Sequence, residues 1–184
     1  MRAGRIGSAE LADLVARGAS LDFSFPVSSL TRLAALAPPA TMVGTARLDS
    51  GFTFQAGAEG YPQVHLVVTG SVPLVCQRCL GLLEWPVSVD VRLTMVRDDQ
   101  EAGVLAEPFD TVLLADGDLL PEQVVEDEVL AALPLAPKHA DGTPCGIGAD
   151  REGGRDANVK SGEMHRPMAG LADLLGRGDR QGDK

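Results

Sequence analysis

Aromatic side chains are scarce in this chain: they make up 4% of its 184 residues, with one Trp and one Tyr. No apolar run approaches the roughly 20 residues that a membrane-spanning helix needs, and the segment after Met1 lacks the apolar stretch of a signal peptide. A phosphate-binding Gly-rich loop with its lysine, an HExxH motif and a GxSxG motif are all absent from the sequence. These absences count against membrane proteins and against common enzyme classes. We expect a cytoplasmic protein without catalytic machinery.

Positive charge is also in short supply. The chain has 16 Lys and Arg against 26 Asp and Glu, so its formal net charge is -10. Between Asp98 and Glu128 every charged residue is acidic, which predicts a negative surface strip. Such a balance disfavours DNA and other polyanions as ligands. The simplest interpretation of the strip is a solvated face, and the alternative is a partner-facing surface formed by Glu126, Asp127 and Glu128.

Strand patterns dominate the middle of the chain. Gln63 to Val75 alternates apolar and polar residues, and so does the run from Trp85 to Met95, which predicts two long antiparallel neighbours. Asp49-Ser50-Gly51 predicts a turn between two shorter strands, and Asp118 is placed to cap a helix that ends before Pro134. Further elements are expected as helices at 8–18, 30–37 and 118–133 and as strands at 21–26, 42–49, 52–56 and 109–114. The pattern indicates an α+β fold, as an antiparallel meander or a partly closed barrel.

Composition changes after the last predicted helix. Residues 140–163 contain six glycines and only two large aliphatic residues, too few to offset the entropy of ordering. Further on, Met168, Leu171 and Leu174 lie at helical spacing. We therefore predict a single domain over 1–139 and a flexible tail over 140–184 with a short terminal helix.

The sharpest chemical feature is the spacing Cys76-Gln77-Arg78-Cys79, which falls in the bend between the two long strands. A mononuclear zinc site needs about four ligands, and the candidates to complete it are Cys145 together with His139 or His65. A redox role would need an acidic thiol, usually at a helix N-terminus, and that context is missing. The third interpretation, which the sequence alone favours, is a pair of small side chains that shape a tight bend.

Two segments resemble a known family. The run Val75-Cys76-Gln77-Arg78-Cys79-Leu80, together with residues 125–139, is similar to the YceD family, the large ribosomal RNA subunit accumulation proteins. The resemblance continues to Cys145 and to a closing segment at 166–172. It implies a factor for accumulation or processing of 23S ribosomal RNA, with no established enzymatic activity. Some branches of the family carry a second cysteine pair that would complete a zinc site, whereas this chain has only Cys145 there.

Charge and resemblance together favour a ribosome-biogenesis factor that acts through ribosomal or rRNA-processing proteins. Direct contact with pre-rRNA stays open if Arg78, Arg92 and Arg97 gather on one face, although Arg92 and Arg97 have opposite strand parity. The alternative hypothesis is a small zinc-binding or thiol-redox protein that uses Cys76 and Cys79.

Overall fold

A computed structural model describes residues 4–38, 46–57, 60–105, 110–140 and residue 145. All of these belong to one compact unit, Met1–Gly146. Apart from Ala140 and Cys145, the predicted flexible tail over 140–184 and its terminal helix lie outside the described residues.

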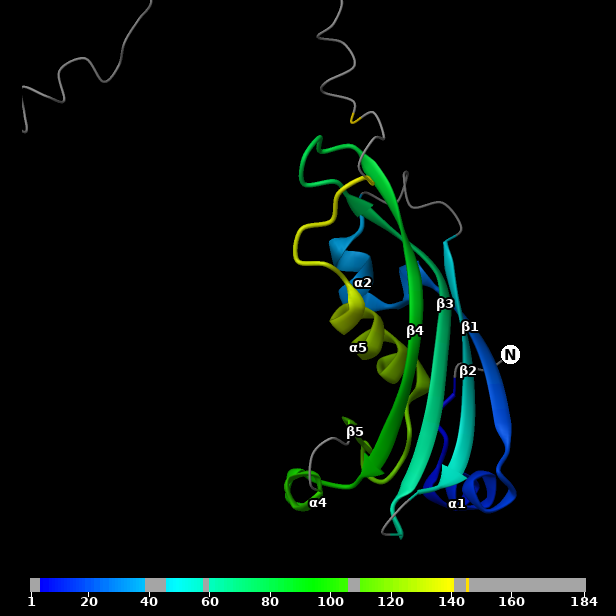
Figure 1. Ribbon diagram of the computed structural model, residues 1–184. Helices are drawn as coiled ribbons and strands as arrows, with labels where there is room; N and C mark the ends of the chain where they lie inside the picture. The colour runs from blue at the N-terminus through cyan, green and yellow to red at the C-terminus, as the bar shows by residue number, and fades with distance from the viewer. Residues whose placement is uncertain (1–3, 39–45, 58–59, 106–109, 141–144, 146–184) are drawn as a thin grey trace, which may run out of the picture. The chain divides into compact units, whose positions relative to one another are not determined.

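The three longest described strands, β2, β3 and β4, follow one another in the chain, and the described helices lie before and after them (Figure 1). None of the described helices is long and apolar enough to span a bilayer. In chain order the elements are α1 (Ser8–Arg17), β1 (Ser20–Pro26), the 3-10 turn η1 (Val27–Ser29), α2 (Thr31–Leu36), β2 (Arg47–Ala56), β3 (Pro62–Val75), β4 (Leu82–Val96), α4 (Asp99–Val104), β5 (Asp110–Leu113) and α5 (Pro121–Ala132).

The strands form one open sheet in the order β1-β2-β3-β4-β5. The first four strands make the predicted antiparallel meander, with each strand beside its neighbour in the chain. β5 instead runs parallel to β4, because the chain crosses back through α4 before it rejoins the sheet. The α+β class is therefore confirmed, the sheet is mixed, and the partly closed barrel is not formed, since β1 and β5 stay at opposite edges.

The predicted turn at Asp49-Ser50-Gly51 is wrong. β2 runs straight through these residues, with Ser50 paired to Phe23 on one side and to Val68 on the other. Pairing on both edges outweighs the local turn preference of these small residues. Gly70 on β3 matters for this pairing, because its φ of 144° suits glycine and a Cβ there would lie 2.5 Å from the Arg47 carbonyl oxygen.

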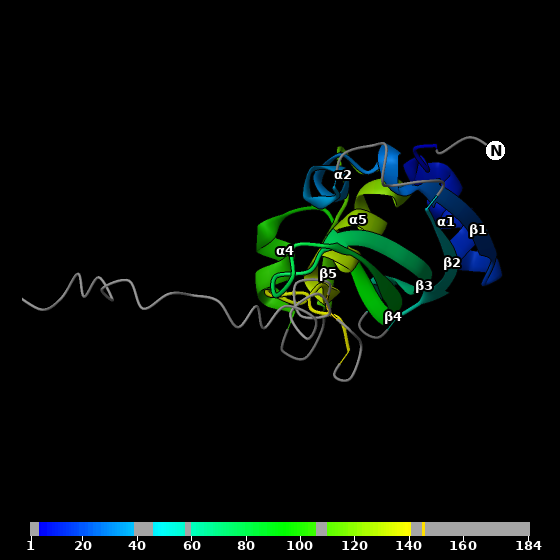
Figure 2. The ribbon, with the colours of Figure 1, turned by 90° about the horizontal axis from the view of Figure 1, so that it is seen from above.

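The alternation predicted for β3 and β4 is confirmed by burial. The side chains on one face of these strands are buried, whereas their neighbours on the other face are mostly exposed or half-buried. Helix α5 lies inside the curve of the sheet on the buried face (Figure 2). It packs Val124, Val125 and Val129 into the same core as Phe52, Leu66 and the other buried strand residues.

The predicted N-terminal cap of the last helix is also corrected. α5 begins at Pro121, and its N-cap Leu120 makes no side-chain bond. Asp118 serves α1 instead: its carboxylate accepts the Ser8 N–H at 3.1 Å and pairs with Arg5. Ser8 is the first residue of α1 and follows the N-cap Gly7. The acidic side chain thus stabilises the helix start that is nearest in space rather than in sequence.

Candidate metal centre

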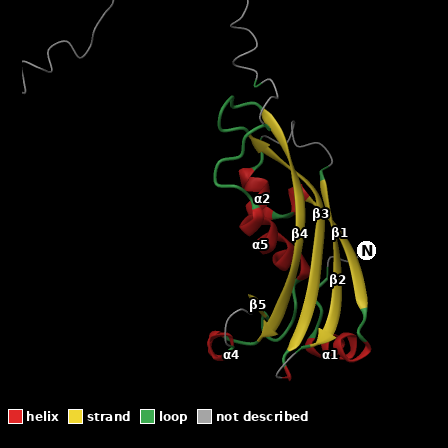
Figure 3. Cartoon of the chain, in the orientation of Figure 1, coloured by secondary structure: helices red, strands yellow, loops and turns green. Residues whose placement is uncertain are grey.

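The loop between β3 and β4 is a tight knuckle at the end of the sheet that lies opposite α1 and α4 (Figure 3). The Cys76 N–H donates to the Gly81 carbonyl at 2.9 Å, and the Leu80 N–H donates to the Cys76 carbonyl at 2.8 Å. Leu80 has a φ of 59°, a conformation that a branched aliphatic residue rarely adopts. These bonds turn the chain sharply enough for both thiols of the CxxC pair to face inward.

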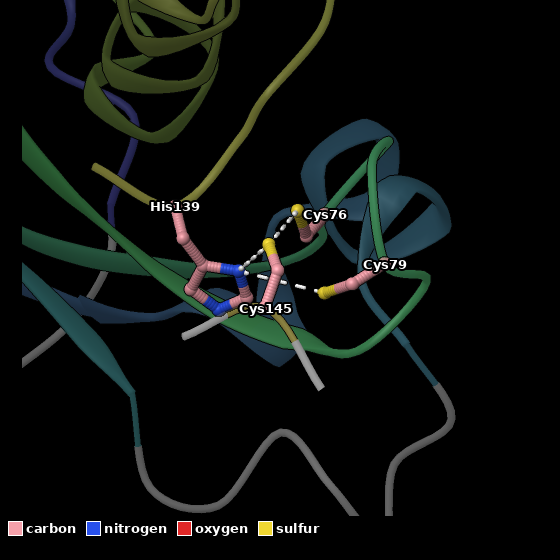
Figure 4. A group of neighbouring side chains, drawn as sticks. All are labelled: Cys76, Cys79, His139 and Cys145. Carbon is pink, nitrogen blue, oxygen red and sulfur yellow. Dashed lines mark hydrogen bonds between the residues drawn. The ribbon is translucent and has the colours of Figure 1, made fainter. Parts of the chain in front are cut away.

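Four side chains converge at this knuckle (Figure 4). The sulfurs of Cys76 and Cys145 lie 3.8 Å apart, and the Nδ1 atom of His139 lies 3.6 Å from the Cys79 sulfur and 3.4 Å from the Cys145 sulfur. All four potential ligand atoms lie within 4.8 Å of one another. Cys76 and Cys79 are buried, whereas Cys145 and His139 are half-buried.

The segment after α5 brings His139 to the hairpin. The Gln77 N–H donates to the Pro137 carbonyl at 2.8 Å, which fixes this segment against the knuckle. The His139 Nε2 atom lies 3.0 Å from the Leu82 carbonyl oxygen, which can only accept, so Nε2 carries the proton. The Nδ1 lone pair then points at the three sulfurs, as a metal ligand would.

The electrostatics of the knuckle favour a thiolate at Cys76. Burial raises the pKa of Cys76, but the backbone N–H groups of His139, Cys79 and Arg78 donate to its sulfur and bring the pKa down to about 5. Burial raises the pKa of Cys145. The hydrogen bond that its sulfur accepts from the Arg78 Nε atom at 3.0 Å acts in the opposite direction but is the smaller effect. Chemically, the group offers three soft sulfur donors and one imidazole nitrogen around one point.

Comparison with protein-family models gives a match over most of the described strands and the last helix. Residues 64–175 match the model described as Large ribosomal RNA subunit accumulation protein YceD. The chain belongs to the YceD family. The match confirms the resemblance inferred from the two sequence segments, and it connects this YceD protein with a ribosome-related role. It spans β3 to α5 and all four residues of the knuckle cluster. No curated protein and no solved structure matches the chain.

The structure of this YceD chain brings together the four residues singled out as possible ligands, Cys76, Cys79, His139 and Cys145. Cys145 was expected in a flexible stretch, yet its sulfur reaches the centre of the group. His65, the other histidine considered, is excluded from it because it pairs with Asp90 at 2.7 Å on β3 and β4. Sequence reasoning missed the contact of Arg78 with Cys145, because no periodic pattern relates residues 67 positions apart.

The three residues of the predicted acidic surface, Glu126, Asp127 and Glu128, differ in their exposure in this YceD protein. Glu126 is only 7% exposed, so its assignment to a partner-facing surface is corrected. Its carboxylate accepts the N–H groups of Arg32 at 2.6 Å and Leu33 at 3.1 Å and pairs with the Arg32 guanidinium at 3.0 Å. It therefore caps α2, whose own N-cap Leu30 has no side chain able to do so. Asp127 remains exposed and Glu128 half-buried.

Proposed function

We propose that this protein is a non-enzymatic factor that supports the synthesis, processing or accumulation of 23S ribosomal RNA through contacts with other proteins. The family match over residues 64–175 carries this proposal. The partner class follows from charge: a chain with a net charge of -10 attracts basic ribosomal proteins or basic processing enzymes more readily than RNA.

Several arginines are engaged within the chain, which supports protein rather than RNA as the direct partner. Arg5, Arg17, Arg32 and Arg97 each form an ion pair with a carboxylate. Arg97 pairs with Glu101 beside the end of β4, away from the knuckle that carries Arg78. Arg78 and Arg97 therefore lie at opposite ends of β4 and do not join in one patch suited to phosphate groups.

The acidic surface that meets the partner lies where α4, β5 and α5 come together. A groove of about 560 Å³ there is lined by Asp99, Asp127 and Glu128 together with exposed Leu113. Burial, together with the charges of Asp110 and Asp127, raises the pKa of Glu128. A cationic side chain of a partner would relieve this repulsion between carboxylates.

Gene deletion combined with complementation tests the proposal. Loss of the gene is expected to lower mature 23S RNA and to raise its precursors, and the wild-type chain is expected to restore both. A double charge reversal, Asp127→Lys with Glu128→Lys, should restore them poorly and should lose basic proteins in affinity capture at low salt. The control Asp49→Lys reverses an exposed charge on the outer face of β2 and should behave as wild type. Unchanged RNA levels after deletion would reject the role in RNA accumulation, and capture of RNA without protein would reject the proposed partner class.

A further inference from the structure

The geometry points to a closed structural metal site at the knuckle: we propose that the sulfurs of Cys76, Cys79 and Cys145 and the Nδ1 atom of His139 together bind one Zn²⁺ ion. This inference rests on the positions of side chains and is independent of the proposed role in ribosome biogenesis.

Three of the six distances between ligand atoms match a tetrahedron around zinc, and all six are within 4.8 Å. With Zn–S bonds of about 2.3 Å and Zn–N bonds of about 2.0–2.1 Å, tetrahedral angles place two sulfurs about 3.8 Å apart and a sulfur and a nitrogen about 3.5 Å apart. The Cys76 and Cys145 sulfurs are separated by 3.8 Å, and His139 Nδ1 lies 3.6 Å and 3.4 Å from the sulfurs of Cys79 and Cys145. These three pairs of donors thus lie at coordination spacing, and each of the four ligands belongs to at least one of them.

The second layer of contacts suits the same ion. The Leu82 carbonyl selects the imidazole tautomer that leaves Nδ1 free to bind, and it fixes the orientation of the ring. Three thiolates, one neutral imidazole and Zn²⁺ sum to one negative charge, which the Arg78 guanidinium next to the Cys145 sulfur offsets. On binding, the cysteines that are still protonated release their protons to solvent, and the zinc–sulfur bonds replace the S–H bonds.

Four protein ligands leave no open coordination position, which is the mark of a structural zinc site. The ion would stabilise a part of the fold that has little else to hold it. Only Leu83 and the two cysteines of the CxxC pair are buried in this small cluster, and Leu80 sits in a strained conformation with 71% of its surface exposed. Zinc would join this hairpin to His139 and Cys145, which lie 60 and 69 residues further along the chain than their partners Cys79 and Cys76.

Metal analysis of the full-length chain, purified without a histidine tag from zinc-supplemented cells, tests the proposal directly. We expect one zinc ion per chain. Replacement by Co²⁺ should produce the intense visible absorption of a tetrahedral site and the near-ultraviolet band of thiolate-to-cobalt charge transfer. A folded chain that holds no zinc after reconstitution, that holds iron instead, or whose cobalt form lacks these bands would overturn the proposal.

Variants separate coordination from general folding. Cys145→Ser and His139→Ala change half-buried residues outside the main core, so the chain should stay folded. Its affinity for zinc should fall by more than the roughly 10–100-fold that is typical when a residue next to a metal ligand is changed. His65→Ala is the matched control, because this histidine pairs with Asp90 and should leave zinc content unchanged. Arg78→Met should weaken zinc binding by about tenfold. Wild-type zinc affinity in both Cys145→Ser and His139→Ala would exclude the proposed ligand set.

Discussion

The main core and the hairpin knuckle are held together in different ways. Among the described residues, the main core gathers twenty-three buried apolar side chains from the sheet, from the helices α1, α2 and α5, and from η1 and the connecting segments. The apolar cluster at the knuckle contains three buried residues, Cys76, Cys79 and Leu83. Both regions include ends of the same strands, β3 and β4, so the difference does not come from the type of secondary structure.

This contrast shows where burial alone is sufficient to hold the fold. Burial of apolar surface contributes about 25 cal/mol per Å², so a cluster with one buried leucine gains little from it. The knuckle depends on hydrogen bonds, such as the one from Gln77 to Pro137, and on its sulfur and imidazole groups. We therefore expect changes in the main core to alter global stability, and changes at the knuckle to alter local order.

Removal of a large core side chain should have the largest effect. Phe52 is fully buried on β2 and packs its ring against Phe23 and Phe54. Phe52→Ala should lower the free energy of unfolding by about 3–5 kcal/mol, since it removes apolar contact and leaves a cavity. Urea denaturation followed by circular dichroism measures this change. A loss below about 1 kcal/mol would contradict the assignment of Phe52 to the main core.

Loss of the Glu126 carboxylate should rank second. Glu126→Ala leaves the N–H groups of Arg32 and Leu33 without their acceptor, and bonds to charged groups contribute about 1.5–3 kcal/mol. Its neighbour Asp127 also pairs with Arg32, at 2.6 Å, but its side chain is 56% exposed. Asp127→Ala should therefore cost less than about 1 kcal/mol. Equal losses in the two variants, measured by urea denaturation, would show that the α2 cap is unimportant.

Acid should weaken the same contact between α2 and α5. Burial acts to raise the pKa of Glu126, but the bonds from Leu33 and Arg32 outweigh it and hold the pKa below its usual 4.5. The contribution of Glu126 to stability is then fully present above the unfolded pKa and is lost as the pH falls through the lower folded pKa. The stability difference between wild type and Glu126→Gln should shrink between about pH 6 and pH 3. Parallel stability curves over this range would argue against a depressed pKa.

Much of the fold could be predicted because alternation is a local signal. The long strands β3 and β4 and the helices α1 and α5 follow from spacing within the sequence, since each buries one face. The continuity of β2 through Ser50 could not be predicted in this way, because it depends on two partner strands. The parallel direction of β5 likewise depends on the path of the chain through α4.

The residues of the candidate site could be predicted from the sequence, but the contacts that bring them together could not. The CxxC spacing placed two thiols at one bend, and only a few other Cys and His residues were available to join them. That Cys145 and His139 reach this bend depends on the exit of α5 and on the bond from Gln77 to Pro137, which no local pattern specifies. The prediction that Glu126 is exposed was wrong for a related reason. An acidic residue is expected on the surface unless a partner is known, and the partner of Glu126 lies on α2.

Metal removal should have the smallest effect on global stability, because it should reduce the protection of amides at the knuckle and leave the main core unchanged. In the proposed zinc site, a chelator that removes the ion takes away the link between the hairpin and the segment around His139. The amide of Gln77, which donates to Pro137, should then exchange with solvent at least about tenfold faster. Amides in the centre of β3, such as that of Leu66, should keep their protection, because the strands on both sides remain paired. Hydrogen exchange before and after chelation separates these outcomes. Loss of protection throughout the sheet would mean that the knuckle and the main core fold as one unit, whereas an unchanged Gln77 amide would mean that apolar contacts and hydrogen bonds hold the knuckle without the ion.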